Sequence, residues 1–323
     1  MKAKLIINPT AGKTKRKMPP ILKWTFKKLK KRLEQIPEQK TTAKDIVNEV
    51  KKKCYENDIK LDISFTKYPK HAMKLAKNAG NKYDLVIVAG GDGTVNEVIN
   101  GLFGSKATLV IIPFGSTNVL ALELGIPFNV KRACDLIVNG KRINIDLGHA
   151  KTNQEERYFS MMLSVGFDAS LINQIDSKFK KRWGKLAYPL AGIKHIFKYK
   201  WSNIHVKHKV HSIGYFVIIS NSKCYGGEYQ IADKANMKDG LLDLIVINRK
   251  KWLDIVGIVF SLLSGKLNTF LSGEYHQTEE AHIYSRKRML VEVDGELIGT
   301  APVKVKIAHK ALKVMVKKSS AIV

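Results

Sequence analysis

The sequence predicts an α/β domain followed by a mainly antiparallel β-sandwich domain. In roughly the first 125 residues, segments with helical spacing alternate with short continuous apolar runs such as 84–89 and 107–112. Apolar runs separated by helices are typical of a parallel sheet that helices cover on both faces. Farther along, alternating apolar and polar positions predominate, as in 303–308, and they indicate antiparallel sheets with one solvent-exposed face.

The elements of the first part follow one another in a regular order. Strands are expected at 3–7, 59–66, 84–89 and 107–112, and helices at 42–57, 70–79 and 94–103. A further helix is expected within the lysine-rich segment 13–32, because Leu22, Phe26 and Leu29 share one helical face.

The second part is expected to consist mostly of strands. They are expected at 142–150, 157–165, 204–210, 213–220, 241–247, 289–293, 296–298, 303–308 and 311–317. Two helices, near 183–198 and 251–264, interrupt them. The pattern changes near residues 125–130, so we expect an α/β domain at 1–127 and a β-sandwich domain at 128–323.

Composition narrows the class of protein. A chain of 323 residues with a net charge of +28 suits about two folded domains and an anionic partner. The three cysteines are far apart in the sequence, which indicates buried thiols in a reducing compartment. The most apolar stretch, 252–263, contains Asp254 and is shorter than the ~20 residues of a membrane-spanning helix.

The segment AGGDGTVNEV (89–98) is the strongest local motif. Gly90, Gly91 and Gly93 lie between a buried strand and an amphipathic helix, where backbone N–H groups can approach an anion closely. The amides and dipole of the helix N-terminus favour negative charge at the same place. The segment is neither a P-loop nor a dinucleotide-binding fingerprint, and a plain glycine turn remains the alternative.

Three polar side chains of this motif suggest more specific roles. Asp92 suits a metal ion that bridges its carboxylate to phosphate. Thr94 and Glu97 have the spacing of a capping box, which would begin the helix at Thr94.

A second loop, IIPFGSTN (111–118), also follows a buried strand and offers backbone and hydroxyl donors. The segment NPTAG (8–12) and Thr66 likewise end predicted strands. Loops at the carboxyl ends of parallel strands converge on one edge of the sheet, so these four loops are expected to meet.

These motifs together resemble the diacylglycerol kinase catalytic family, which includes bacterial lipid kinases, sphingosine kinases and ceramide kinases. The matching segments are NPTAG (8–12), GGDGTVNEV (90–98), PFGSTNVLALELGIP (113–127), INIDLG (143–148), SVGFDAS (164–170), KDGLLDL (238–244) and VDGE (293–296). The resemblance implies an ATP- and Mg²⁺-dependent transferase of lipid metabolism and phospholipid biosynthesis, which phosphorylates a hydroxyl of a diacylglycerol-like or sphingoid-like lipid.

The resemblance also implies a set of binding residues. The nucleotide would contact Asn8, Thr10, Gly12, Thr66, Gly90, Gly91, Asp92, Gly93, Thr94, Asn96, Glu97, Gly115, Ser116 and Asn118. A Mg²⁺ site would use Asp239 with carbonyl groups near Asn236 and Leu241, and Asp146 would contribute to its surroundings. Without the resemblance, the segment around Asp239 reads equally well as a turn before a strand.

The segment VDGE (293–296) is where this family places its catalytic acid. We expect Glu296 to be the general base that accepts the proton of the lipid hydroxyl, with Asp294 as the second choice and Asp92 as a further catalytic carboxylate. On spacing alone, the segment is also an ordinary β-hairpin with an Asp-Gly turn.

Two basic segments with aromatic residues, 13–32 and 178–201, suggest peripheral contact of a cytoplasmic protein with the anionic inner face of a membrane. A solvated helix face is the alternative for either segment. Edge strands of the second part could pair between copies as a homodimer. Two other functions compete: a NAD kinase-like phosphotransferase acting on a soluble nucleotide, and a nucleic-acid-binding protein, for which no specific module is evident.

Overall fold

The computed structural model describes residues 1–11, 41–167, 169–170, 201–225, 229–248 and 273–319. The helices expected at 13–32, 183–198 and 251–264, and both basic segments except Trp201, lie outside these residues. The described chain forms two compact units, one with Met1–Ile143 and the residues from Lys313 onward, the other with most of the chain between them. The domain limits expected at 127 and 128 stay a prediction.

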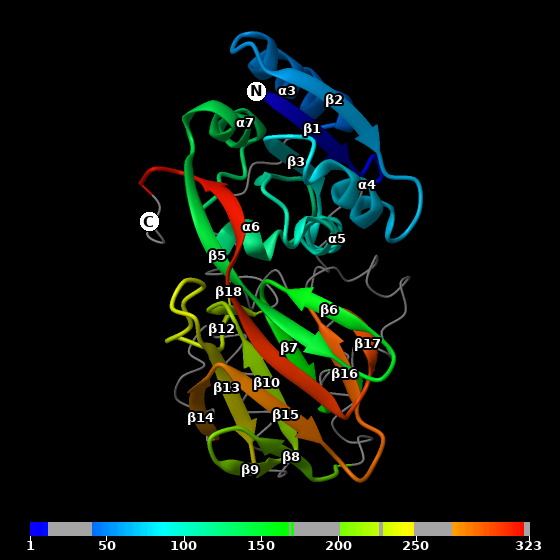
Figure 1. Cartoon of the computed structure of the whole chain (residues 1–323), viewed down its shortest axis with the longest axis vertical. Coiled ribbons are helices and arrows are strands. Elements are labelled where there is room, and N and C mark those ends of the chain that lie inside the picture. The colour runs from blue at the N-terminus through cyan, green and yellow to red at the C-terminus, as the bar shows by residue number, and fades with distance from the viewer. Residues whose placement is uncertain (12–40, 168, 171–200, 226–228, 249–272, 320–323) are drawn as a thin grey trace, which may run out of the picture. The chain divides into compact units, whose positions relative to one another are not determined.

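The first unit contains the predicted parallel sheet. Its strands are β1 (Lys2–Ile7), β2 (Lys60–Phe65), β3 (Leu85–Gly90) and β4 (Thr108–Pro113), in the order β2-β1-β3-β4. The helices between them are α3 (Ala43–Tyr55), α4 (His71–Ala79) and α5 (Asp92–Leu102). Every residue of β3 and β4 is buried, as expected for strands that are covered on both faces. Figure 1 shows these elements in blue to cyan.

Two helices of this unit were not expected from the sequence. They are α6 (Val119–Glu123), which follows the second loop, and α7 (Val130–Asn139), which packs against α3 and β4. The side chain of Asn129 caps α7 by accepting a hydrogen bond from the Arg132 amide, at 3.2 Å.

The second unit is a sandwich of antiparallel sheets. One sheet has the order β14 (Glu274–Thr278), β13 (Leu242–Ile247), β10 (Phe216–Ser220), β7 (Met162–Val165), β16 (Leu290–Val293) and β17 (Glu296–Thr300). The other has the order β18 (Val303–Val316), β15 (Glu280–Tyr284), β8 (Ile204–Lys207) and β9 (His211–Gly214). Strand β18 also pairs with β5 (Lys141–Lys151), which pairs with β6 (Glu156–Phe159). The end of β18 from Lys313 belongs to the first unit, where it pairs in parallel with β4. Buried side chains from both sheets form one hydrophobic core. A two-residue pair, β11 (Cys224–Tyr225) and β12 (Tyr229–Gln230), completes the described strands.

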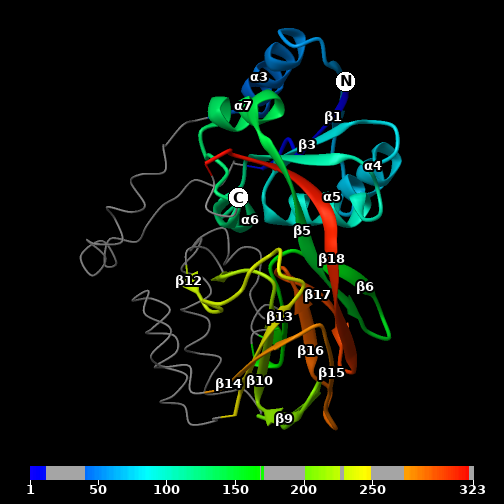
Figure 2. The same ribbon diagram turned by 60° about the vertical axis from the view of Figure 1, so that its left-hand side comes forward.

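Some predicted strands have different limits in the structure. The strand expected at 157–165 is divided into β6 and β7, whereas those expected at 303–308 and 311–317 form the single strand β18. Lys310, between the two expected strands, lies within β18 and adopts a left-handed conformation, with φ of 52°. Figure 2 shows β18 in red as one long strand. No helix in the described part of the chain is long and apolar enough to span a bilayer.

Helices α4 and α5 pack closely because Gly101 has no side chain. A Cβ atom at Gly101 would lie 2.4 Å from the Met73 carbonyl oxygen and 2.7 Å from Ala76 Cβ. Both distances are shorter than van der Waals contact, so any side chain at this position would force the two helices apart.

Gly101→Ala is therefore expected to lower the free energy of unfolding by about 1–3 kcal/mol through overpacking. The usual effect in a helix is the opposite, a gain of about 0.5–1 kcal/mol. Urea unfolding measures whether the free energy of unfolding falls or rises. Asn78→Ala on the exposed face of α4 is the control and should be neutral or stabilising. A more stable Gly101→Ala protein would contradict the close packing.

Candidate functional site

The glycine loop, Gly90–Thr94, joins β3 directly to α5. Gly91 is the N-cap residue of α5 in an extended conformation, and as a glycine it has no side chain to cap this helix end. The first amides of a helix have no partner within the helix, so the N-terminus of α5 can receive an anion. The residues Gly91 to Thr94 are half-buried, as a binding surface requires.

The backbone of the second loop, Phe114–Val119, comes very close to the glycine loop. A Cβ atom at Gly115 would lie 2.4 Å from Gly91 Cα and 2.8 Å from Asn118 Oδ1. Gly115 has a φ angle that other residues also adopt, so the sequence needs glycine at this position for space. The two loops form one continuous backbone surface at the end of the sheet.

Asp92 holds the two loops together. Its Oδ1 accepts a hydrogen bond from the Val119 amide at 2.6 Å, and its Oδ2 accepts one from the Asn118 amide at 2.9 Å. These amides begin α6, so the carboxylate caps that short helix. Sequence reasoning gave Asp92 a metal-bridging role and missed this structural one.

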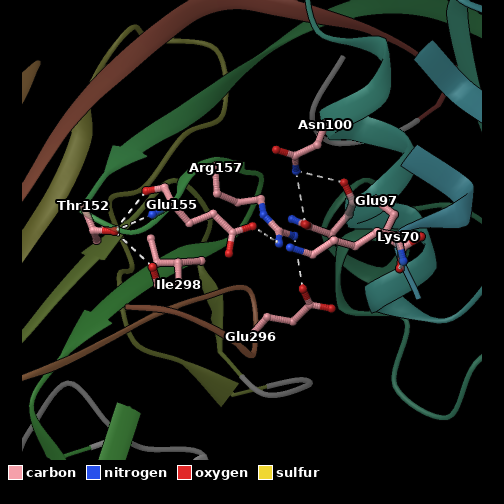
Figure 3. Close-up of polar contacts among 9 residues, drawn as sticks. Lys70, Glu97, Asn100, Thr152, Glu155, Arg157, Glu296 and Ile298 are labelled. Carbon is pink, nitrogen blue, oxygen red and sulfur yellow. Dashed lines mark hydrogen bonds and ion pairs between the residues drawn. The ribbon is translucent and has the colours of Figure 1, made fainter. Parts of the chain in front are cut away.

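The capping box expected from Thr94 and Glu97 is not formed. Because α5 begins at Asp92, Thr94 lies inside the first turn. The Glu97 carboxylate instead accepts hydrogen bonds from the Lys70 amide, at 2.8 Å, and the Ala72 amide, at 3.0 Å, at the start of α4. Figure 3 shows Glu97 beside Lys70. Glu97 therefore caps the neighbouring helix and not its own.

The first strand's loop reaches the glycine loop through a side chain. Asn8 Nδ2 donates to Thr94 Oγ1 at 3.1 Å, and Asn8 Oδ1 accepts from the amide and hydroxyl of Thr10. Thr66 follows β2, and its amide donates to the Ile7 carbonyl at 2.9 Å. Three of the four predicted loops are thus joined by side-chain contacts, and Gly12 lies outside the described residues.

The remaining candidate nucleotide residues differ in exposure. Asn96 is buried, and its side-chain oxygen accepts a hydrogen bond from Asn100 Nδ2 at 3.2 Å. Asn118 is buried in a left-handed conformation and exchanges hydrogen bonds with the Gly115 backbone. Ser116 is exposed at the tip of the second loop, with its hydroxyl 3.5 Å from that of Thr117.

In the second unit, Asp146 organises the loop that was expected to bind metal. Its fully buried carboxylate accepts from the Gly240 amide at 2.7 Å and the Lys310 amide at 2.6 Å, and His309 Nδ1 lies at 2.9 Å. A carboxylate with three donors suits an anchor better than a direct metal ligand. Asp146 lies within β5, and its donors come from the turn at Gly240 and from β18.

The loop itself offers oxygen ligands. Asp239 is exposed, and its Oδ1 accepts a hydrogen bond from the Leu241 amide at 3.0 Å. The Asn236 carbonyl accepts from the Lys238 amide at 2.8 Å, which closes the turn. Among the described residues no group of three or more His, Cys, Asp or Glu side chains could hold a metal ion. A site here would therefore depend on Asp239 and backbone carbonyls, which suits Mg²⁺ with bound waters.

Asp294 is fully engaged at the tip of the hairpin formed by β16 and β17. Its carboxylate accepts from the amides of Ser160, Met161 and Met162 at 2.9–3.0 Å, and from the Ser160 hydroxyl at 3.2 Å. The residue has a φ of 47°, which an Asp-Gly turn tolerates. Asp294 thus fixes the chain between β6 and β7, and this contact is why the expected strand is divided there.

Glu296 is the other acid of the hairpin, and its side chain is 43% exposed. Arg157 Nη1 donates to its Oε2 at 3.1 Å, while Arg157 Nη2 donates to Glu155 Oε1 at 2.7 Å. Figure 3 shows the Arg157 guanidinium between these two carboxylates. Burial opposes the positive charge, but the bonds to the carboxylates and their charges outweigh it and raise the pKa of Arg157. No sequence pattern identified this arginine.

Comparisons with known proteins identify two domains in the chain. Residues 37–150 match the diacylglycerol kinase catalytic domain, and residues 161–316 match the YegS C-terminal NAD kinase beta sandwich-like domain. A diacylglycerol kinase of Bacillus subtilis is 29% identical over 259 residues, covering 78% of this chain and 83% of the relative. A diacylglycerol kinase of Staphylococcus saprophyticus is 25% identical and covers 93% of this chain and 90% of its own.

A crystal structure of a diacylglycerol kinase from Bacillus anthracis has the same fold. It aligns with a TM-score of 0.71 at 21% identity, over 98% of this chain and 97% of the other. Both the α/β part and the β-sandwich part agree with the two-part fold predicted from the sequence. The chain belongs to the diacylglycerol kinase catalytic family and is a lipid kinase of that family.

Proposed function

We propose that this lipid kinase transfers the γ-phosphate of ATP to a hydroxyl of a diacylglycerol-like or sphingoid-like lipid. The joined loops around Gly91 and Gly115 carry the proposal, because they present backbone amides and the N-terminus of α5 at one edge of the sheet. Asp92 keeps the second loop in place beside the first. Such a surface binds the phosphates of a nucleotide without requiring a P-loop lysine.

The role that we propose for Mg²⁺ is electrostatic. When bound, the ion would neutralise charge that develops on the phosphate oxygens. Asp239, with carbonyls near Asn236 and Leu241, offers it oxygen ligands, and Asp146 holds that loop from beneath.

Glu296 is the better candidate for the general base. The Asp294 carboxylate accepts four hydrogen bonds. If it took up a proton, it would lose hydrogen bonds that hold the chain between β6 and β7. Glu296 is partly exposed, and Arg157 holds one of its oxygens in a defined position. We assign Arg157 as a positioning residue for the proton acceptor.

The NAD kinase-like alternative is supported by one observation, the description of the C-terminal domain family. It calls for a soluble nucleotide acceptor in place of a lipid.

We propose in addition that the protein is cytoplasmic and contacts the inner face of the membrane peripherally, since the acceptor resides in a bilayer. The homodimer expected from the edge strands stays a prediction.

The proposed reaction is tested with purified protein, [γ-³²P]ATP and Mg²⁺. Diacylglycerol, sphingosine and NAD are offered separately, the lipids in neutral detergent micelles. Label is expected in a lipid product and not in NAD. The variant Gly115→Ala is expected to lose most of this turnover, because its Cβ would displace the glycine loop. Label in NAD alone, or in no lipid, would refute the proposed acceptor.

A double-mutant cycle tests the acid and the arginine together. Glu296→Gln is expected to lower kcat by about 10²–10⁴ without a comparable change in the KM for ATP. Arg157→Gln lowers kcat in the wild type but should have little further effect in Glu296→Gln, because Arg157 acts through that carboxylate. Arg157→Lys should recover part of the loss.

Thr152→Val provides the matched structural control. The buried Thr152 hydroxyl lies 3.0 Å from the carbonyl oxygens of Glu155 and Ile298, so its loss lowers stability while the Arg157–Glu296 pair remains. Its kcat should stay near that of the wild type at a temperature where both are folded. Full activity of Glu296→Gln would show that Glu296 is not the general base. If the losses of kcat in the two single variants instead add in the double variant, Arg157 does not act through Glu296.

A further inference from the structure

An open cavity of about 500 Å³ lies at the edge of the parallel sheet opposite the glycine loop. It is lined by Lys2 of β1, by Lys60, Leu61 and Asp62 of β2, and by Lys82 and Tyr83, which precede β3. These three strands are parallel, so the cavity lies where they begin, whereas the glycine loop lies where β3 ends. Strands of this length separate the two places by roughly 17–20 Å. We call this feature the lysine cavity.

Three ammonium groups surround the lysine cavity. Lys2, Lys60 and Lys82 are all exposed, and Lys2 is the register partner of Lys60 on the neighbouring strand. Like charges at neighbouring strand positions repel each other. None of the three lysines forms an ion pair with an acid in the described part of the chain. With Asp62 as the acid of the lining, the cavity carries an excess of positive charge.

The nearby acids are bound to other donors. Asp62 Oδ2 accepts a hydrogen bond from the Tyr83 hydroxyl at 2.6 Å, and Asp84 Oδ2 accepts one from the Lys2 backbone amide at 2.7 Å. The hydrogen bond to Asp62, together with burial and the charge of that acid, raises the pKa of Tyr83, so its hydroxyl stays a donor. The two acids thus hold a hydroxyl and a backbone amide, and the lysine charges remain available to a ligand.

Two structural roles do not account for all of these lysines. Lysines near the C-terminal end of a helix interact favourably with its dipole, but the last turns of α3 and α4 already contain Lys52, Lys53 and Lys77. Lysines on an edge strand discourage pairing between molecules. That role suits Lys60 on β2 but not Lys2, because β1 has neighbours on both sides.

The lining indicates the chemistry of the ligand. Ammonium groups are compact charges with several donors, which suit the oxygens of a phosphate group. The half-buried side chains of Leu61 and Tyr83 offer an apolar wall to an organic group. The Asp62 carboxylate has lone pairs for further donors such as hydroxyl groups, and it repels a second anionic group.

We propose that the lysine cavity binds a small phosphate monoester that carries hydroxyl groups. Its phosphate group lies among Lys2, Lys60 and Lys82, and its hydroxyl groups donate to Asp62. The inference goes beyond the proposed function, because this ligand binds at the other edge of the sheet from the nucleotide.

Lysine footprinting of the full chain tests the proposal residue by residue. The protein is acetylated with acetic anhydride, and mass spectrometry gives the rate at each lysine. Mg²⁺ and a non-hydrolysable ATP analogue are present throughout to occupy the glycine loop. The probe is glycerol 3-phosphate, and glycerol and inorganic phosphate are compared with it at the same concentration.

At about ten times its Kd, glycerol 3-phosphate leaves about one site in ten free. It is therefore expected to slow the acetylation of Lys2, Lys60 and Lys82 about tenfold. Glycerol should have no effect, and inorganic phosphate should protect less. Lys44 and Lys51, which are exposed on α3, should react at unchanged rates.

Two charge-matched double variants separate the cavity from the general charge of the protein. Lys60→Gln/Lys82→Gln is expected to lose the protection of Lys2, whereas Lys44→Gln/Lys51→Gln should retain it. Thermal unfolding without ligand checks that both variants are folded.

Three results would overturn the proposal: unchanged acetylation of the cavity lysines, equal slowing at Lys44 and Lys51, or full protection of Lys2 in the Lys60→Gln/Lys82→Gln variant. Equal protection by inorganic phosphate and glycerol 3-phosphate would overturn the assignment of an ester.

Discussion

Two backbone amides, those of Asn118 and Val119, bind the carboxylate of Asp92, and the candidate site depends on this contact. The contact places the second loop against the glycine loop, where glycine at position 115 allows the backbones to approach. It also begins α6, a helix too short to be stable without such support. The amides that face the edge of the sheet owe their arrangement to one acidic side chain.

The same physical device recurs in the second unit. Asp146 receives the amides of Gly240 and Lys310, and Asp294 receives three amides between β6 and β7. Each acid belongs to a motif that suggested chemistry, yet each satisfies backbone donors of a segment distant in the sequence. Hydrogen bonds to an ionised acceptor are stronger than neutral ones, so a single aspartate can fix an irregular segment. Glu296 and Asp239 are the more exposed acids of these motifs, and the proposed chemistry is assigned to them.

The sequence was informative where local pattern and burial coincide. The parallel strands β3 and β4 are continuous runs of apolar residues, and these runs alone give their positions in the chain. The start of α5 was predicted wrongly because the spacing of Thr94 and Glu97 fits a capping box, while Glu97 in fact caps α4. Which helix Glu97 caps is decided by a tertiary contact, and the spacing of residues in the sequence does not reveal that contact. The role of Arg157 was missed for the same reason: its partner Glu296 lies 139 positions away in the chain.

We propose that the glycine loop and the second loop bind nucleotide as one surface. Amide hydrogen exchange with and without Mg²⁺ and ATP tests it directly, in peptides that cover 88–97 and 114–122. We expect ATP to slow exchange in both peptides over the same concentration range, and Asp92→Asn to remove the effect from the second peptide because the bond to Val119 or Asn118 is lost. Protection of only one loop in the wild type, or of neither, would contradict the account.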